Sequence, residues 1–168
     1  MEESDVRAGG RTGGAGVEAG IFAADTLESA CQSRPASRDG ERLDLYLDSV
    51  AGLARDLGAD LAALSGRLDD GERRASRAAL TSAALRAADL ATLAACAVPE
   101  LPPGSPARLR AAAATHLAAA AARSLALERR ALAGPEGPGG YETLDLRGAE
   151  WRAGLAARQV EEPRQEDA

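Results

Sequence analysis

A row of apolar residues in the middle of the chain is spaced alternately by four and three positions. Its members are Leu43, Leu47, Val50, Ala54, Leu57, Leu61, Leu64 and Leu68. Because an α-helix repeats every 3.6 residues or so, this alternation places all of them on one helical face, as in a coiled coil. Such a face must pack against other helices rather than against water. The row therefore predicts a helical bundle.

Composition excludes most alternatives to an all-α fold. Hydrophobic residues make up 45% of the 168 residues, and alanine supplies more than half of them. Aromatic residues reach only 2%, and valine and isoleucine are scarce. The residue types that favour β-strands are thus nearly absent, whereas alanine and leucine are strong helix formers.

Glycine, proline and capping residues mark the ends of three helices. Gly66 disfavours continuation of the first helix, and Pro99 ends the second by removing a backbone donor. Ser105 followed by Pro106 is typical of a helix start, and Gly134 of a helix end. We expect an antiparallel up-down-up three-helix bundle joined by short loops. Its long helices span about 40–66, 70–98 and 106–133.

The second and third predicted helices carry smaller apolar rows than the first. The row on the second helix is Leu80, Ala83, Ala87, Leu90, Ala94 and Ala97. The row on the third helix is Leu109, Ala113, Leu117, Ala120, Ser124, Leu127 and Ala131. Leucines that pack against alanines allow close approach of helix axes. Further apolar residues, such as Leu45 and Leu53, lie beside these rows, and self-association through them stays an open alternative.

The two ends of the chain are rich in glycine, proline and charge, so we expect flexible tails at 1–38 and 134–168 around one folded unit at 39–133. A short helix is possible in each tail, at 21–31 and at 144–160. The second of these segments has an apolar content unusual for a tail. It contains Tyr141 just before it, then Leu144, Leu146, Trp151, Leu155 and Val160.

Trp151 stands four residues before Leu155, so both lie on one side of a helical turn. Tryptophan is enriched among binding hot spots, which makes Trp151 and Leu155 candidate residues for docking a protein partner. The alternative is that this short helix folds back onto the chain's own bundle, because an isolated helix of this length is marginal in water.

Charge and cysteine content narrow the class of protein further. The net charge is -6, whereas a protein that holds a phosphate backbone needs an excess of positive charge, so nucleic acid is not an expected partner. All 20 basic residues are arginine, which excludes lysine chemistry. Cys31 and Cys96 lack the spacing of a zinc or redox motif and suit a reducing cytoplasm.

The N-terminal segment lacks the apolar core of a signal peptide, and no stretch has the length and hydropathy expected of a membrane span. We therefore expect a cytoplasmic protein that does not bind membranes. The run from Gly14 to Gly20 superficially resembles a nucleotide-binding loop. Its spacing is wrong and no strand precedes it, so it is assigned to the flexible tail.

Residues with catalytic or ligand-binding chemistry are few. His116 is the only histidine and lies in a stretch made almost entirely of alanine, whereas phosphotransfer or general-base catalysis needs suitable neighbours at defined positions. No glutamate stands three residues before it, which argues against a di-iron site. Several arginines could clamp an anion between helices. The candidate pocket residues are His116, Arg123 and Arg86, and no cofactor or metal is predicted.

Two functional hypotheses follow. The first is a non-enzymatic helical module for protein–protein interaction or scaffolding, with itself or another protein as partner. The alternative is a small-molecule or anion-binding bundle, with catalysis left open, that uses arginines and His116. Convergence of these side chains on an interior cavity would favour the alternative, and outward-pointing side chains would count against it.

Overall fold

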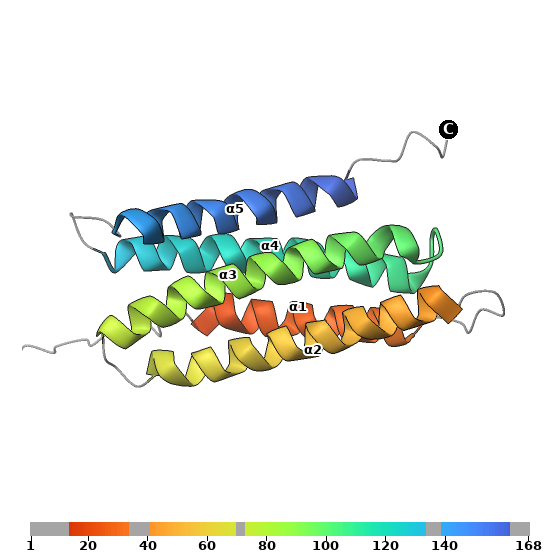
Figure 1. Cartoon of the computed structure of the whole chain (residues 1–168), viewed down its shortest axis with the longest axis horizontal. Coiled ribbons are helices and arrows are strands. Elements are labelled where there is room, and N and C mark those ends of the chain that lie inside the picture. Colours follow the sequence, from red (N-terminus) through yellow and green to blue (C-terminus); the bar gives the residue numbers. More distant parts are fainter. Residues whose placement is uncertain (1–13, 34–40, 70–72, 134–138, 162–168) are drawn as a thin grey trace, which may run out of the picture.

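The computed structural model describes residues 14–33, 41–69, 73–133 and 139–161, which contain five α-helices and one short 3-10 helix. These are α1 (Gly14–Gln32), α2 (Glu41–Asp69), α3 (Arg73–Ala97), η1 (Val98–Glu100), α4 (Pro106–Ala131) and α5 (Gly140–Glu161). Successive α-helices run in opposite directions (Figure 1). No strand occurs in these ranges, so the all-α prediction is confirmed.

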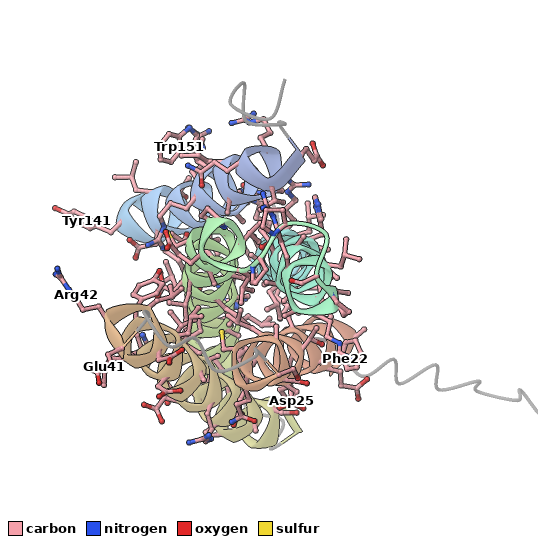
Figure 2. The ribbon with its side chains drawn as sticks, turned by 90° about the vertical axis from the view of Figure 1, so that its right-hand side faces the viewer. Phe22, Asp25, Glu41, Arg42, Tyr141 and Trp151 are labelled. Carbon is pink, nitrogen blue, oxygen red and sulfur yellow. The ribbon has the colours of Figure 1, made fainter. Side chains whose placement is uncertain are left out.

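The helices form three layers, with α1 and α2 in the first, α3 and α4 in the second and α5 alone in the third (Figure 1). α1 packs against α2 and α4, and α3 packs against the same two helices, so these four close into a ring. α5 packs on α3 and α4 from the side opposite to α1 and α2, as the end-on view in Figure 2 shows.

The predicted number of helices is not confirmed, because the part of the chain that the structure describes contains five α-helices instead of three. The three predicted helices correspond to α2, α3 and α4, and α2 continues past Gly66 to Asp69. The added helices are α1 and α5, which extend beyond the short segments expected at 21–31 and 144–160. Each alanine-rich face buries little apolar area, so a larger number of helices is needed to bury enough area in total.

The glycine-rich run at the start of α1 is helical, contrary to its assignment to a flexible tail. A Cβ atom placed on Gly16 would lie 2.9 Å from Cγ of Leu125, and one on Gly20 would lie 2.8 Å from Cδ1 of Leu61. Absence of side chains here lets α1 approach α4 and α2 closely. The rest of the predicted tails, residues 1–13, 34–38, 134–138 and 162–168, lies outside the described residues. Whether 39–133 forms a unit by itself stays a prediction.

The apolar row on α2 is confirmed as its packing face. Leu47, Val50, Ala54, Leu61 and Leu64 are buried. Leu43 and Leu57 are half-buried against the same core, and the side chain of Leu68 lies outside the described residues. The row on α3 is likewise buried throughout, from Leu80 to Ala97.

The apolar row predicted on α4 is wrong, because Leu109 and Leu127 are exposed. The inner face of α4 consists mostly of alanine and also includes Thr115, Leu125 and Arg129. α4 contacts α1, α3 and α5, and small side chains let three helices approach it at once. Reading the largest residues as the inner face therefore fails on this helix. Its predicted start is confirmed, since Oγ of Ser105 accepts a hydrogen bond from the amide of Arg108 at 3.1 Å.

Candidate functional site

The outer face of α5 carries a row of large apolar side chains that the bundle does not cover. Tyr141 is 89% exposed, Leu144 65% and Trp151 63%. Leu155 is half-buried, and Gly148 stands in the middle. We call these five residues the α5 stripe. Their spacing alternates between three and four, and Figure 2 shows Trp151 on the side of α5 that faces away from the other helices.

The opposite face of α5 fixes this helix to the bundle. Leu146, Ala149, Ala153 and Ala156 are buried against α3 and α4. The 144–160 segment thus does pack on its own bundle, as one alternative expected. Trp151, however, lies on the outward face. The helix is apolar on two sides, and among the described residues only one side packs against other helices.

A buried polar cluster ties the start of α5 to α3 and α4. Arg129 is only 5% exposed, and its Nε donates to Oε1 of Glu142 at 2.6 Å while its Nη2 donates to Oε2. The hydroxyl of Thr81 donates to the same Oε1 at 2.6 Å. Arg77 closes the cluster, since its Nη2 donates to the carbonyl oxygen of Leu132 at 2.7 Å. Three helices therefore meet at one charged contact.

The electrostatics of this cluster favour an ionised Glu142. Burial opposes ionisation, but hydrogen bonds from Arg129 and Thr81, with the charges of Arg129 and Arg77, outweigh it and lower the pKa of Glu142 below its ordinary value. Within the described chain, Nη1 of Arg129 and Nε of Arg77 are buried without a hydrogen-bond partner. The cluster thus holds more buried donors than Glu142 can satisfy.

Further ion pairs hold α5 along its length. Arg130 on α4 binds Glu150 through two contacts of 2.8 and 2.5 Å, and the hydrogen bond to Glu150 raises the pKa of Arg130. Arg152 on α5 donates to Asp89 of α3 at 2.9 Å. These pairs are partly accessible to water, so each contributes only about 0–1 kcal/mol.

The candidate anion-binding residues do not come together. Arg86 lies on the α2 side of α3, where its Nε is 3.2 Å from Asp60 beside a shallow open hollow between the two helices. Arg123 lies on α4, and its Nη2 would be 3.4 Å from a Cβ on Gly154 of α5. Nδ1 of His116 is 3.8 Å from a carboxylate oxygen of Glu161. Each side chain is exposed rather than directed into an interior cavity.

Other chemistry is limited within the described residues. They contain no group of three or more histidine, cysteine or acidic side chains placed to hold a metal ion. Cys31 is buried in α1 and Cys96 is exposed on α3, and neither forms a disulfide. The stretch Arg77–Glu100 is long and apolar enough to cross a membrane by length and composition, contrary to the sequence-based expectation. Its most apolar 18-residue segment has a mean hydropathy of 1.2, and 56% of that segment is buried inside the bundle.

Sequence reasoning found Trp151 and Leu155 but missed the stripe to which they belong. The signal was present, because Tyr141, Leu144 and Gly148 continue the same three-and-four spacing. No such signal marks the contact between Arg129 and Glu142, since these residues lie on different helices. No family model matches the chain, and neither a curated protein nor a solved structure is significantly similar to it.

Proposed function

We propose that this chain is a non-enzymatic interaction module in which α1 to α4 form the scaffold and α5 presents its stripe to a protein partner. The exposed α5 stripe is the observation that carries this proposal. Contiguous apolar surface on a folded protein marks interaction sites, and tryptophan and tyrosine are enriched at their energetic centres. Trp151 and Tyr141 are the two aromatic residues of the stripe.

The stripe differs from the other exposed apolar residues in its continuity. Among the other exposed large apolar residues, Phe22 stands alone on α1, and Leu109 and Leu127 on α4 are about five helical turns apart. On α2, the adjacent Leu45 and Tyr46 are separated from Leu53 by about two turns, and among the described residues no other exposed large apolar side chain continues the row on that face to either side. The stripe instead has a large apolar residue at four of five consecutive positions on one face. Because α5 is already folded, little ordering entropy is lost when a partner binds.

A protein partner fits the charge better than nucleic acid or a membrane does. The net charge is -6, and Arg129 and Arg130, which lie beside α5, are engaged by carboxylates of the same chain. The apolar stretch of α3 serves in this proposal as a core helix of a water-soluble bundle. Cytoplasmic location is part of the proposal, supported by an exposed Cys96 outside any disulfide. The alternative anion-binding function is not favoured by its candidate residues, since Arg86, Arg123 and His116 do not share a cavity.

Photo-cross-linking in the cells that produce the protein tests the proposal. A benzoylphenylalanine at Tyr141 replaces one exposed aromatic ring with another, and the same group at Leu53 on α2 serves as the control. We expect protein adducts from position 141, none from position 53, and loss of the first when Trp151→Ala is added. Absence of adducts from position 141 would contradict the proposal.

A further inference from the structure

We infer that the partner of the α5 stripe is the α5 stripe of a second copy of this chain, packed antiparallel about a two-fold axis. This inference rests on the proposed function and specifies its partner. It is argued from three features of α5: the spacing of the stripe, the open space above Gly148 and the charges on either side of the stripe.

The spacing suits a helix pair. At about 100° per residue the five stripe positions fall within an arc of about 80°, and they extend over about 21 Å of helix. Alternation of three and four positions is the repeat by which two helices keep one contact line over several turns. Self-pairing needs a surface complementary to itself, so large and small positions must match.

Gly148 and Trp151 supply that match. A Cβ atom on Gly148 would meet no atom of the described residues within 4 Å, so the middle of the stripe is an open notch. An antiparallel pair can place Trp151 over Gly148 of the second copy, and by symmetry the reverse. The same register brings Leu144 against Leu155 of the second copy. Leu144, Trp151 and Leu155 then each meet an apolar or empty position, and Tyr141 lies opposite Arg158 of the second copy.

Charges on the flanks favour the same register. Asp145 and Arg152 lie on one side of the stripe, and Arg147 lies on the other. In the register above, Asp145 faces Arg152 of the second copy, and this contact occurs twice. Arg152 also donates to Asp89 of its own chain, and a guanidinium has enough N–H groups to bind both carboxylates. Arg147 faces Gly154, which carries no charge.

Other arrangements bring like charges together. A parallel pair places Arg147 beside Arg152 of the second copy. An antiparallel pair shifted by seven residues places Asp145 against its own equivalent, and also Arg147 against its own. Like charges in direct opposition disfavour wrong partners and registers. In the favoured arrangement, α1 to α4 of each copy lie behind their own α5, so the two scaffolds do not collide.

The small number of side chains in the contact implies a dimer that dissociates reversibly. Four large apolar side chains from each copy make an interface at the small end of specific complexes, which corresponds to dissociation constants of roughly micromolar order. We therefore expect the monomer and dimer to exchange with protein concentration.

Sedimentation equilibrium over a range of concentrations, combined with fluorescence, tests the inference on the full chain. Trp151 is the only tryptophan, so its emission reports directly on burial of the stripe. We expect a monomer–dimer equilibrium and a blue shift of emission over the same concentrations. Trp151→Ala should raise the dissociation constant by about tenfold or more, as expected for a central aromatic side chain. Leu53→Ala on α2 is the control and should leave it unchanged.

Three variants distinguish the proposed register from non-specific apolar association. Gly148→Leu adds apolar surface and favours the helix, yet it fills the notch, so the dimer should be lost. Asp145→Arg should weaken the dimer, and so should Arg152→Asp. An equimolar mixture of these two should associate again, because both flank contacts then join opposite charges. Circular dichroism checks that each variant is folded.

The outcomes separate this inference from the proposed function. A monomer at every concentration overturns the inference, and so does a dimer that ignores Gly148→Leu and Asp145→Arg. If the chain is monomeric but position 141 cross-links to a different protein in cells, the inference fails and the proposed function stands. If the chain is monomeric and no adduct forms, both fail.

Discussion

α1 packs against α2 and α4, and α5 packs against α3 and α4, yet different kinds of interaction hold the two helices in place. α1 lies between α2 and α4, and Gly16 and Gly20 allow Leu125 and Leu61 to fill the space beside it. α5 rests on α3 and α4 through an alanine face and a series of ion pairs. Close packing dominates the attachment of α1, where the exposed pair of Glu28 with Arg55 of α2 adds little, whereas ion pairs are more numerous and less exposed along α5.

This difference makes α1 a core element, whereas the attachment of α5 depends on solution conditions. Close apolar packing responds little to pH or salt, whereas ion pairs depend on both. Arg129 shows this dependence most clearly, because a buried guanidinium that loses its carboxylate partner destabilises the folded chain. The attachment of α5 therefore depends on the ionisation of Glu142, and the exposed stripe depends on the attachment of α5.

The largest expected difference between the two helices appears when each is deleted. α2 packs chiefly against α1 and α3, so removal of residues 1–33 leaves α2 with one neighbour and uncovers Leu61 and Leu125. We expect that chain to lose cooperative unfolding. Removal of 139–168 should leave a folded four-helix ring, since α1 to α4 keep their mutual contacts. Helicity and thermal melting by circular dichroism measure both, and equal behaviour of the two deletions would break the comparison.

Leu61→Ala tests the packing of α1 by a single side chain. Leu61 is fully buried beside Gly20, and a cavity at such a position lowers the free energy of unfolding by about 2–5 kcal/mol. Urea denaturation measures this change. Leu53→Ala on the exposed side of the same helix is the matched control, with an expected change within about 0.5 kcal/mol.

Glu142→Gln tests the attachment of α5. The variant leaves the guanidinium of Arg129 buried without a counter-charge, which should cost about 2–3 kcal/mol. Glu150→Gln is the control, because Arg130 remains partly open to water and its pair contributes only about 0–1 kcal/mol. Hydrogen exchange of α5 amides measures both. An equal loss of protection in the two variants would show that burial of Arg129 has no special weight.

The sequence predicted the helical class and the inner faces of α2 and α3, because leucines in a regular repeat identify a packing face. It failed on α4, where alanines line the interior and the leucines point outward. It also missed α1 as a full helix, since glycine normally disfavours helices and here permits a close approach instead. In each failure, contacts with distant parts of the chain overrode the local preference of the residues.

The candidate site shows the same division. Trp151 and Leu155 could be singled out from residue type and local spacing. The buried contact of Arg129 with Glu142 could not, because it depends on how α4 and α5 pack. Likewise, nothing in the local sequence separates the outward face of α5 from its inward face, since both are apolar; Leu146 and Leu144 differ only in which side the bundle covers.

Acidification should release α5 before α1. The pKa of Glu142 in the folded chain lies below its ordinary value of 4.5, so the unfolded chain takes up the proton more readily as pH falls. The stabilising contribution is complete above about pH 4.5 and is lost as pH falls through the lower folded pKa. Exchange protection factors in α5 should decline over this interval before those in α1. Glu142→Gln should remove this pH dependence, and a decline that persists in the variant would assign it to other carboxylates.

The smallest expected effect comes from the same substitution made in both helices. Gly148→Ala adds a methyl group to open space on α5 and lowers the entropy of the unfolded chain, so it should raise the free energy of unfolding by about 0.5–1 kcal/mol. Gly20→Ala would gain the same intrinsic term but places its Cβ 2.8 Å from Cδ1 of Leu61. That terminal methyl must move within a closed interior, where overpacking costs about 1–3 kcal/mol. Urea denaturation of dilute protein should therefore give changes of opposite sign. If both substitutions stabilise the chain, Leu61 yields easily, and the contact of α1 is less exacting than its geometry indicates.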